Sequence, residues 1–116
     1  MKYFSVAEFR CKGIGCCDHG DHMNPQFLDM IDMAREISGV VYLINSGHRC
    51  PYHNREVGST TDNHPSGKAA DIKCKSGPNR IQILTGLIGA GFKRIGIAQD
   101  FIHCDISEGV ESCWLY

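Results

Sequence analysis

The chain has 116 residues, of which 42% are hydrophobic and 22% are charged, and this balance predicts one ordinary globular domain spanning residues 1–116. The net charge of −1 excludes a strong general attraction to nucleic acid or anionic membranes, and no apolar run is long enough for a membrane-spanning helix. The first residues, soon followed by Glu8 and Arg10, do not form a secretory signal peptide, so we expect synthesis in the cytoplasm.

The first half of the chain predicts one helix and one strand. Asn24 and Pro25 suit an N-cap and a first helical position, and Gly39 suits the helix exit. The run Val40–Ile44 is rich in β-branched residues and predicts a buried strand, whereas Ser46–Ser66 is polar and predicts mostly loop. The apolar residues at helical spacing are Phe27, Leu28, Ile31, Ala34 and Ile37.

A second helix is expected from Asn79 to about Gly89. Gly77 and Pro78 interrupt the preceding pattern, and Asn79 is a residue type that caps helices. The expected apolar face consists of Ile81, Leu84, Leu87 and Ile88.

Three short strands complete the prediction. Ala69–Cys74 is one, and Arg94–Ala98 and Phe101–Ile106 are two more, joined by a tight turn at Gln99-Asp100. The tail after Ile106 gives little signal apart from its final Trp114-Leu115-Tyr116. We therefore predict an α+β fold, in which two main helices lie on a small, largely antiparallel sheet.

Alternation along two of these strands points to a metal site. In Ala69–Cys74 the even-numbered residues are apolar, so Asp71 projects from the opposite face. His103 occupies the equivalent position in Phe101–Ile106, and His64 precedes the first of these strands in a loop. Two imidazoles and one carboxylate around an open position are typical of catalytic zinc. A surface hydrogen bond between histidine and aspartate is the alternative that the spacing leaves open.

Seven cysteines are many for a short chain, and the odd number leaves at least one without an intramolecular partner. Cys11, Cys16 and Cys17, with His19 and His22 beside them, are a candidate second, structural zinc site. Free thiols, or a disulfide formed after release from the cell, are the alternatives. Two further cysteines share the apolar register of their strands and are expected in the core: Cys74 and Cys104.

Three blocks of sequence resemble the zinc D-Ala-D-Ala carboxypeptidase family. His64-Pro65-Ser66-Gly67-Lys68-Ala69-Ala70-Asp71 is similar to the family's H-x-x-G-x-A-x-D, and His103-Cys104-Asp105 to its later H-x-D. Ser46-Gly47-His48-Arg49 resembles its upstream S-G-Y-R segment. Tyr3-Phe4 with Glu8-Phe9 is similar to the start of small phage and bacterial members, so the resemblance runs from about Phe4 to Asp105.

This resemblance implies one catalytic Zn2+ held by His64, Asp71 and His103, and a fold shared with the hedgehog signalling domain. It implies hydrolysis of peptide bonds in peptidoglycan stem peptides, with D-alanyl-D-alanine as the first expectation. An L-alanyl-D-glutamate endopeptidase of the endolysin type is the enzymatic alternative. Because fold and metal site do not prove catalysis, a zinc-containing cell-wall-binding or phage structural module stays open.

The resemblance also suggests roles around the metal. The fork of Arg49 suits a substrate carboxylate, and Ser46 would support the substrate or Arg49. Asp100 lies where related dipeptidases carry a glutamate base; it is either the general base or a turn residue. Asp105 would orient His103 through a hydrogen bond, or is simply a polar strand residue.

The expected partner is a peptidoglycan peptide, and the expected state is a monomer. Without a signal peptide, the protein would reach the cell wall only after release, through a holin or with a virion.

Overall fold

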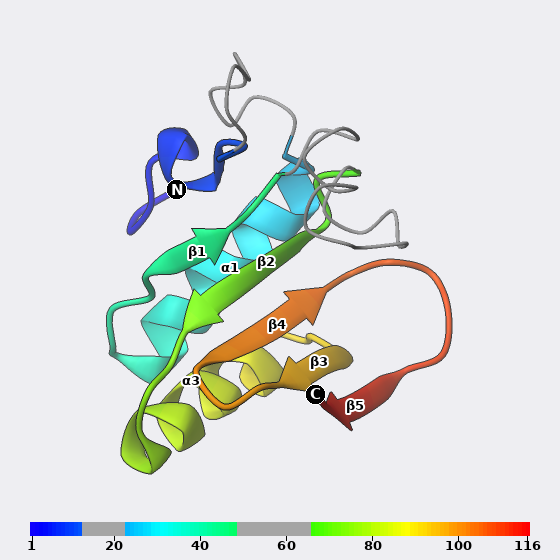
Figure 1. Cartoon of the computed structure of the whole chain (residues 1–116). Coiled ribbons are helices and arrows are strands. Elements are labelled where there is room, and N and C mark those ends of the chain that lie inside the picture. Colours follow the sequence, from blue (N-terminus) through cyan, green and yellow to red (C-terminus); the bar gives the residue numbers. More distant parts are fainter. Residues whose placement is uncertain (13–22, 49–65) are drawn as a thin grey trace.

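The computed structural model describes residues 1–12, 23–48 and 66–116 (Figure 1). Its elements are a 3-10 helix η1 (Val6–Phe9), the helices α1 (Pro25–Ser38) and α3 (Gly77–Gly89), and the strands β1 (Ile44–Ser46), β2 (Ala69–Lys73), β3 (Arg94–Ile97), β4 (Phe101–Asp105) and β5 (Ser112–Leu115). In the described part of the chain this is an α+β fold with two helices and one five-stranded sheet, as the sequence predicts. Neither described helix is long and apolar enough to cross a membrane.

Helix α1 begins and ends where its capping residues predict. The backbone N–H of Phe27 donates to the Asn24 side chain over 3.1 Å, and Pro25 occupies the first turn, where its missing N–H costs nothing. Gly39 ends the helix with a φ of 71°, a left-handed conformation that glycine adopts without penalty.

Helix α3 begins earlier than predicted. Its N-cap is Ser76, whose hydroxyl accepts from the backbone N–H of Asn79 over 3.2 Å, so Asn79 lies inside the helix. Pro78 is part of the first turn and does not break the element. The predicted apolar face is also partly wrong, because Ile81 and Ile88 are mostly exposed. The buried residues of α3 are Ile83, Gly86 and Leu87.

The sheet has the strand order β1-β2-β4-β3-β5, and every neighbouring pair is antiparallel except β3 with β5. Strand β5 lies in the tail, for which no strand is predicted from local patterns. The predicted strand Val40–Ile44 is wrong in position: β1 begins only at Ile44, and Tyr42 is buried between the exposed Val41 and Leu43.

Both helices lie on one side of the sheet (Figure 1). The core forms between them, with Phe27 and Ile31 from α1 and Ile83 and Leu87 from α3. The alternate residues of the central strands close it from the sheet side, and they include the predicted pair of core cysteines: Ala70, Ile72, Cys74, Ile102 and Cys104. We call the other side of the sheet its open face.

Candidate metal centre

One row of residues crosses the sheet with a single residue from each strand. Ser46 of β1 pairs with Asp71 of β2, which pairs with His103 of β4; His103 pairs with Gly96 of β3, and Gly96 with Trp114 of β5. Because paired residues in a sheet point to the same side, the row lies on the open face. This register places Asp71 and His103 side by side, as the alternation along their strands predicts.

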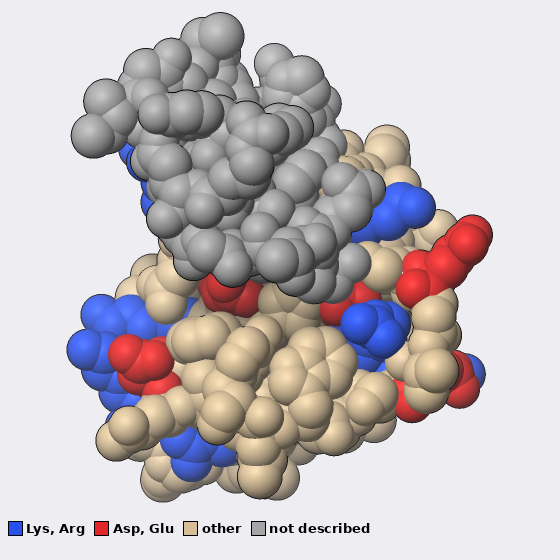
Figure 2. Space-filling view, turned by 45° about the vertical axis from the view of Figure 1, so that its right-hand side comes forward, with Lys and Arg blue, Asp and Glu red and all other residues tan. Residues whose placement is uncertain are grey.

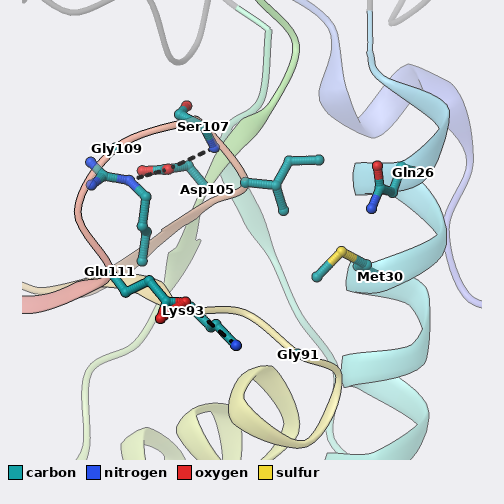
Figure 3. A pocket seen from close by; sticks show the side chains of 10 residues that line it. Gln26, Met30, Gly91, Lys93, Asp105, Ser107, Gly109 and Glu111 are labelled. Carbon is teal, nitrogen blue, oxygen red and sulfur yellow. Dashed lines mark hydrogen bonds and ion pairs between the residues drawn. The ribbon is translucent and has the colours of Figure 1, made fainter.

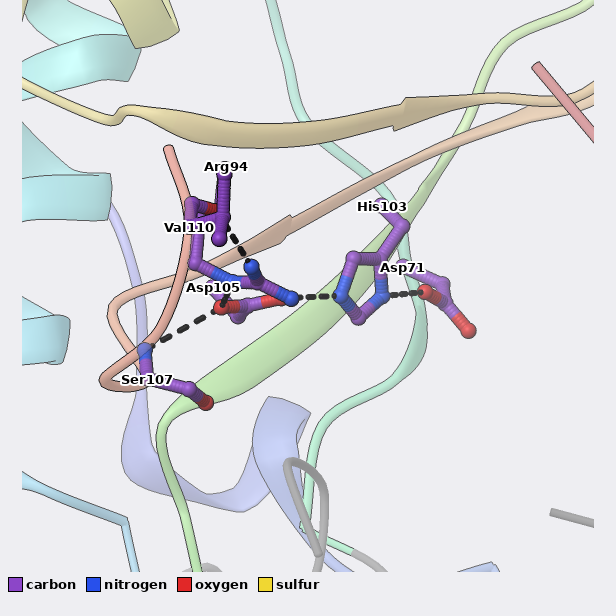
Figure 4. A network of polar contacts seen from close by, with 6 residues as sticks. All are labelled: Asp71, Arg94, His103, Asp105, Ser107 and Val110. Atoms are coloured by element: carbon purple, nitrogen blue, oxygen red, sulfur yellow. Dashed lines mark hydrogen bonds and ion pairs between the residues drawn. The ribbon is translucent and has the colours of Figure 1, made fainter. Parts of the chain in front are cut away.

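The centre of the row is a histidine between two carboxylates (Figure 4). His103 Nδ1 lies 2.8 Å from Asp71 Oδ1, and its Nε2 lies 2.7 Å from Asp105 Oδ2. The His103 side chain is 6% exposed, and that of Asp71 is 18% exposed. Asp71 is therefore more accessible to solvent than His103, whose ring is held by a carboxylate on each side.

Asp105 is anchored from its own side. Its Oδ1 accepts from Arg94 Nε over 2.7 Å and from the backbone N–H of Ser107 over 3.1 Å (Figure 4). Arg94 also donates through Nη1 to the carbonyl of Val110 over 2.7 Å. The Asp105 carboxylate is completely buried, so these bonds fix both its position and that of His103.

The network sets the protonation of both partners. Burial opposes the charged form of His103, but hydrogen bonds to Asp105 and Asp71 outweigh burial and raise the pKa of the imidazole. Burial also opposes ionisation of Asp105, but bonds from His103 and Arg94 outweigh it and lower the pKa of this carboxyl. Each ring nitrogen of His103 therefore faces one carboxylate, an arrangement that favours the protonated ring more than an isolated imidazole would.

A cavity of about 290 Å³ lies behind Asp105, between α1 and the segment that joins β4 to β5 (Figure 3). Gln26 and Met30 line it from α1, and the ion pair Lys93–Glu111 lies at its rim. Asp105 and its partners Arg94 and Ser107 line this cavity, but Asp71 and His103 do not, so it is a separate feature from the Asp71–His103 pair.

Comparison with known proteins then identifies the kind of protein. The family model described as Peptidase M15 matches residues 2–105, almost the whole chain. The chain belongs to the peptidase M15 family. No curated protein matches this M15 chain. M15 peptidases depend on zinc, and membership of this family supports a metallopeptidase.

The described residues of this M15 peptidase fit zinc in part. Asp71 and His103 supply an oxygen and a nitrogen donor side by side, and both donor types are zinc ligands. Asp105 on the far nitrogen matches the carboxylate that commonly orients a metal-binding histidine. No group of three or more potential ligands occurs within residues 1–12, 23–48 and 66–116. His64, the third predicted ligand, lies outside these residues.

The remaining predicted site residues are distributed unevenly. Ser46 lies directly beside Asp71 across β1 and β2. Arg49, like Cys16 and Cys17, lies outside the described residues, whereas Cys11 is buried at 4% exposure. Asp100 is exposed in the turn between β3 and β4, where its carbonyl accepts from the Cys74 N–H over 2.9 Å. Its turn position is thus established, and its role as a base stays a prediction.

Sequence reasoning missed three residues of this site. Arg94 anchors Asp105, Gly96 is the row member next to His103, and Trp114 ends the row. The terminal Trp114-Leu115-Tyr116 was the available signal, because exposed aromatic clusters often mark binding surfaces. Only the parallel pairing of β5 with β3 connects that signal to His103.

Proposed function

We propose that the chain, acting as one domain, is a zinc-dependent peptidase that hydrolyses a peptide bond in peptidoglycan stem peptides. Zinc would be held by His64, Asp71 and His103. The observation that carries the proposal is the adjacent carboxylate and imidazole of Asp71 and His103 on the open face of an M15 chain. A bound zinc would supply an activated water and polarise the carbonyl oxygen of the scissile bond.

The protein's own groups would position this chemistry. Asp105 would hold the His103 ring by accepting from Nε2–H, which leaves Nδ1 facing Asp71. Ser46, beside Asp71, would contact the substrate, and Arg49 would bind a substrate carboxylate.

Asp100 is proposed as the base that accepts a proton and returns it to the leaving amine. It precedes His103 by three residues, about 10 Å along an extended strand, so this role requires its side chain to extend from the turn along the open face.

Two bonds are candidates within the stem peptide. The sequence motifs favour D-alanyl-D-alanine, and L-alanyl-D-glutamate is the alternative. Either substrate lies in the cell wall, which the protein would reach through a holin or with a virion.

The test combines metal analysis with product analysis on purified peptidoglycan. We expect one zinc at the His64 site, with release of D-alanine or of stem fragments, and loss of both zinc and release in His64→Ala and Asp71→Asn. Asp29→Ala is the control, because Asp29 is exposed on α1, on the other side of the sheet. Zinc binding without any release would instead indicate a binding module, and zinc independent of His64 and Asp71 would refute the proposed site.

A further inference from the structure

Three aromatic rings lie together on the open face beside the candidate metal centre. Phe101 and Tyr116 have ring centroids 5.1 Å apart, and Tyr116 and Trp114 are 6.4 Å apart. Trp114 lies 5.6 Å from the His103 ring. We call Phe101, Trp114 and Tyr116 the aromatic platform.

Gly96 makes room for the platform. A Cβ at this position would lie 2.5 Å from the indole Nε1 of Trp114 and 2.8 Å from the Tyr116 ring. Both rings therefore rest directly on the backbone of β3. The Arg94 guanidinium lies 5.4 Å from the Trp114 ring, and the same guanidinium anchors Asp105. The platform is thus built into the structure that holds His103.

The platform is exposed to a ligand. Tyr116 is 68% exposed, and Phe101 and Trp114 are partly exposed. Exposed aromatic groups beside polar residues are typical of ligand sites, because each ring offers a flat apolar face. Figure 2 shows a field of uncharged surface on this side of the molecule, with charged residues toward its margins.

The charges around the platform limit what it can bind. Lys73 pairs with Phe101 across β2 and β4 and is exposed. Asp71 and Asp105 both contact His103, and Arg94 already binds Asp105 and the Val110 carbonyl. The matching ligand is consequently an uncharged ring with an apolar face, and an anionic group on that ligand could approach the exposed Lys73.

We propose that the aromatic platform is a subsite for a sugar ring, that of the N-acetylmuramic acid that carries the stem peptide. This inference rests on the proposed function. A pyranose presents a face of C–H groups, which packs against the electron-rich face of an aromatic ring. The stem peptide offers methyl groups and charged side chains but no large apolar side chain, so the sugar is the part of the substrate that fits flat rings.

The position of the platform also selects the bond. Phe101 and His103 are two residues apart on β4, about 7 Å, which is the length of about two residues of extended substrate. The L-alanyl-D-glutamate bond lies within two residues of the sugar. The D-alanyl-D-alanine bond lies four residues away, roughly 13 Å in an extended chain. A sugar on the platform therefore places the sugar-proximal bond at the metal.

The test compares muramyl pentapeptide with the free pentapeptide of the same sequence. Binding is measured by titration calorimetry and cleavage by mass spectrometry of the products. We expect the wild type to bind the muramyl form about tenfold more tightly, the effect of one good aromatic contact, and to cut it after L-alanine. Phe101→Ala and Tyr116→Ala should reduce this ratio to about one.

Leu115→Ala is the matched control, because Leu115 is 79% exposed on β5 but alternates to the other side of the strand. It should keep the tenfold ratio. Circular dichroism and urea unfolding establish that each variant is folded.

Three results would overturn the sugar subsite: equal affinity of the wild type for both ligands, platform variants that weaken both ligands equally, or the same loss in Leu115→Ala. A wild type that prefers the muramyl form but cuts nothing would refute the proposed peptidase while supporting the subsite. Cleavage that His64→Ala abolishes, without any preference of the wild type for the muramyl form, would support the proposed peptidase and refute the sugar subsite.

Discussion

The two sides of the central strands differ sharply although their residues alternate along the same backbone. Ile72 and Ile102 point into the core and are completely buried, whereas Asp71 and His103 point to the open face and contact each other. The helix side is held by non-directional burial of apolar area. The open face is held by a chain of directional bonds in one register. Stability is therefore expected to depend on the first side, and metal chemistry on the second.

Two neighbouring substitutions on β2 separate the sides most strongly. Asp71→Asn should lower peptidase activity by more than the roughly 10–100-fold that loss of an outer hydrogen-bond partner costs, because it would remove a proposed direct zinc ligand. It should change the free energy of unfolding little, since the amide keeps an acceptor for His103. Ile72→Ala should lower the free energy of unfolding by about 2–5 kcal/mol and keep the zinc. Urea unfolding, zinc analysis and activity assays check both, and equal stability losses would contradict the division.

Gly86 tests how tightly the helix side is packed. A Cβ here would collide with the Ala34 carbonyl and the Tyr42 hydroxyl, and it would lie 2.8 Å from the Ser38 Cβ. Gly86→Ala should therefore lower the free energy of unfolding by about 1–3 kcal/mol. Gly77→Ala, with nothing within 4 Å of the new Cβ, should be neutral or slightly stabilising in the same urea titration. An unchanged free energy of unfolding in Gly86→Ala would show that α1 and α3 move apart easily.

Substitution of Asp105 tests the hydrogen-bond network that holds His103. Asp105→Asn weakens the bonds to His103 and Arg94, so we expect zinc affinity to fall about 10–100-fold. Competition with a chelator measures this change. Glu111→Gln, at an exposed ion pair, is the control and should leave zinc affinity unaltered. An unchanged affinity in Asp105→Asn would mean that Asp105 is only a structural partner of Arg94.

Tyr42 gives the smallest effect at neutral pH and a distinct pH dependence. Its single O–H is shared between the carbonyls of Ala34 (3.2 Å) and Ile83 (3.4 Å), so Tyr42→Phe should cost about 1 kcal/mol. Burial raises the pKa of Tyr42 to about 12, above its ordinary 10.0. A raised folded-state pKa contributes stability that is complete below pH 10 and is lost as the pH rises toward 12.

The difference between wild type and Tyr42→Phe should consequently shrink above pH 10, reverse roughly one pH unit higher, and change by up to roughly 2–3 kcal/mol in all for two pKa units. Urea unfolding of both proteins from pH 7 upward measures it. A pH-independent difference would mean that the phenol ionises equally in the folded and unfolded chain.

The predictable parts of the fold are those whose signals are local. Asn24, Pro25 and Gly39 define α1 through their own backbone and capping chemistry. Pro78 misled the prediction of α3, because the same residue ends one element and fits the first turn of the next.

The parts that the sequence did not predict depend on pairing between strands that lie far apart in the chain. Strand β5 has no clear apolar alternation and is stabilised by pairing with β3, which no local pattern reveals. The neighbourhood of Asp71 and His103 was predictable from alternation, because two antiparallel strands with apolar residues in phase place their polar residues together. The bonds from Arg94 to Asp105 and the contact of Trp114 with His103 required the register of β3 and β5.

Trp114 is the single tryptophan of the chain, and its indole lies 5.6 Å from the His103 ring. Its fluorescence emission therefore reports from one place, beside the candidate metal centre. Paramagnetic ions such as Co2+ or Cu2+ quench a fluorophore at this range. If they bind at the candidate centre, they would lower the fluorescence intensity of Trp114 in proportion to their occupancy. The close approach permitted by Gly96 thus gives the open face an intrinsic fluorescent reporter with which metal loading of the proposed site can be tested.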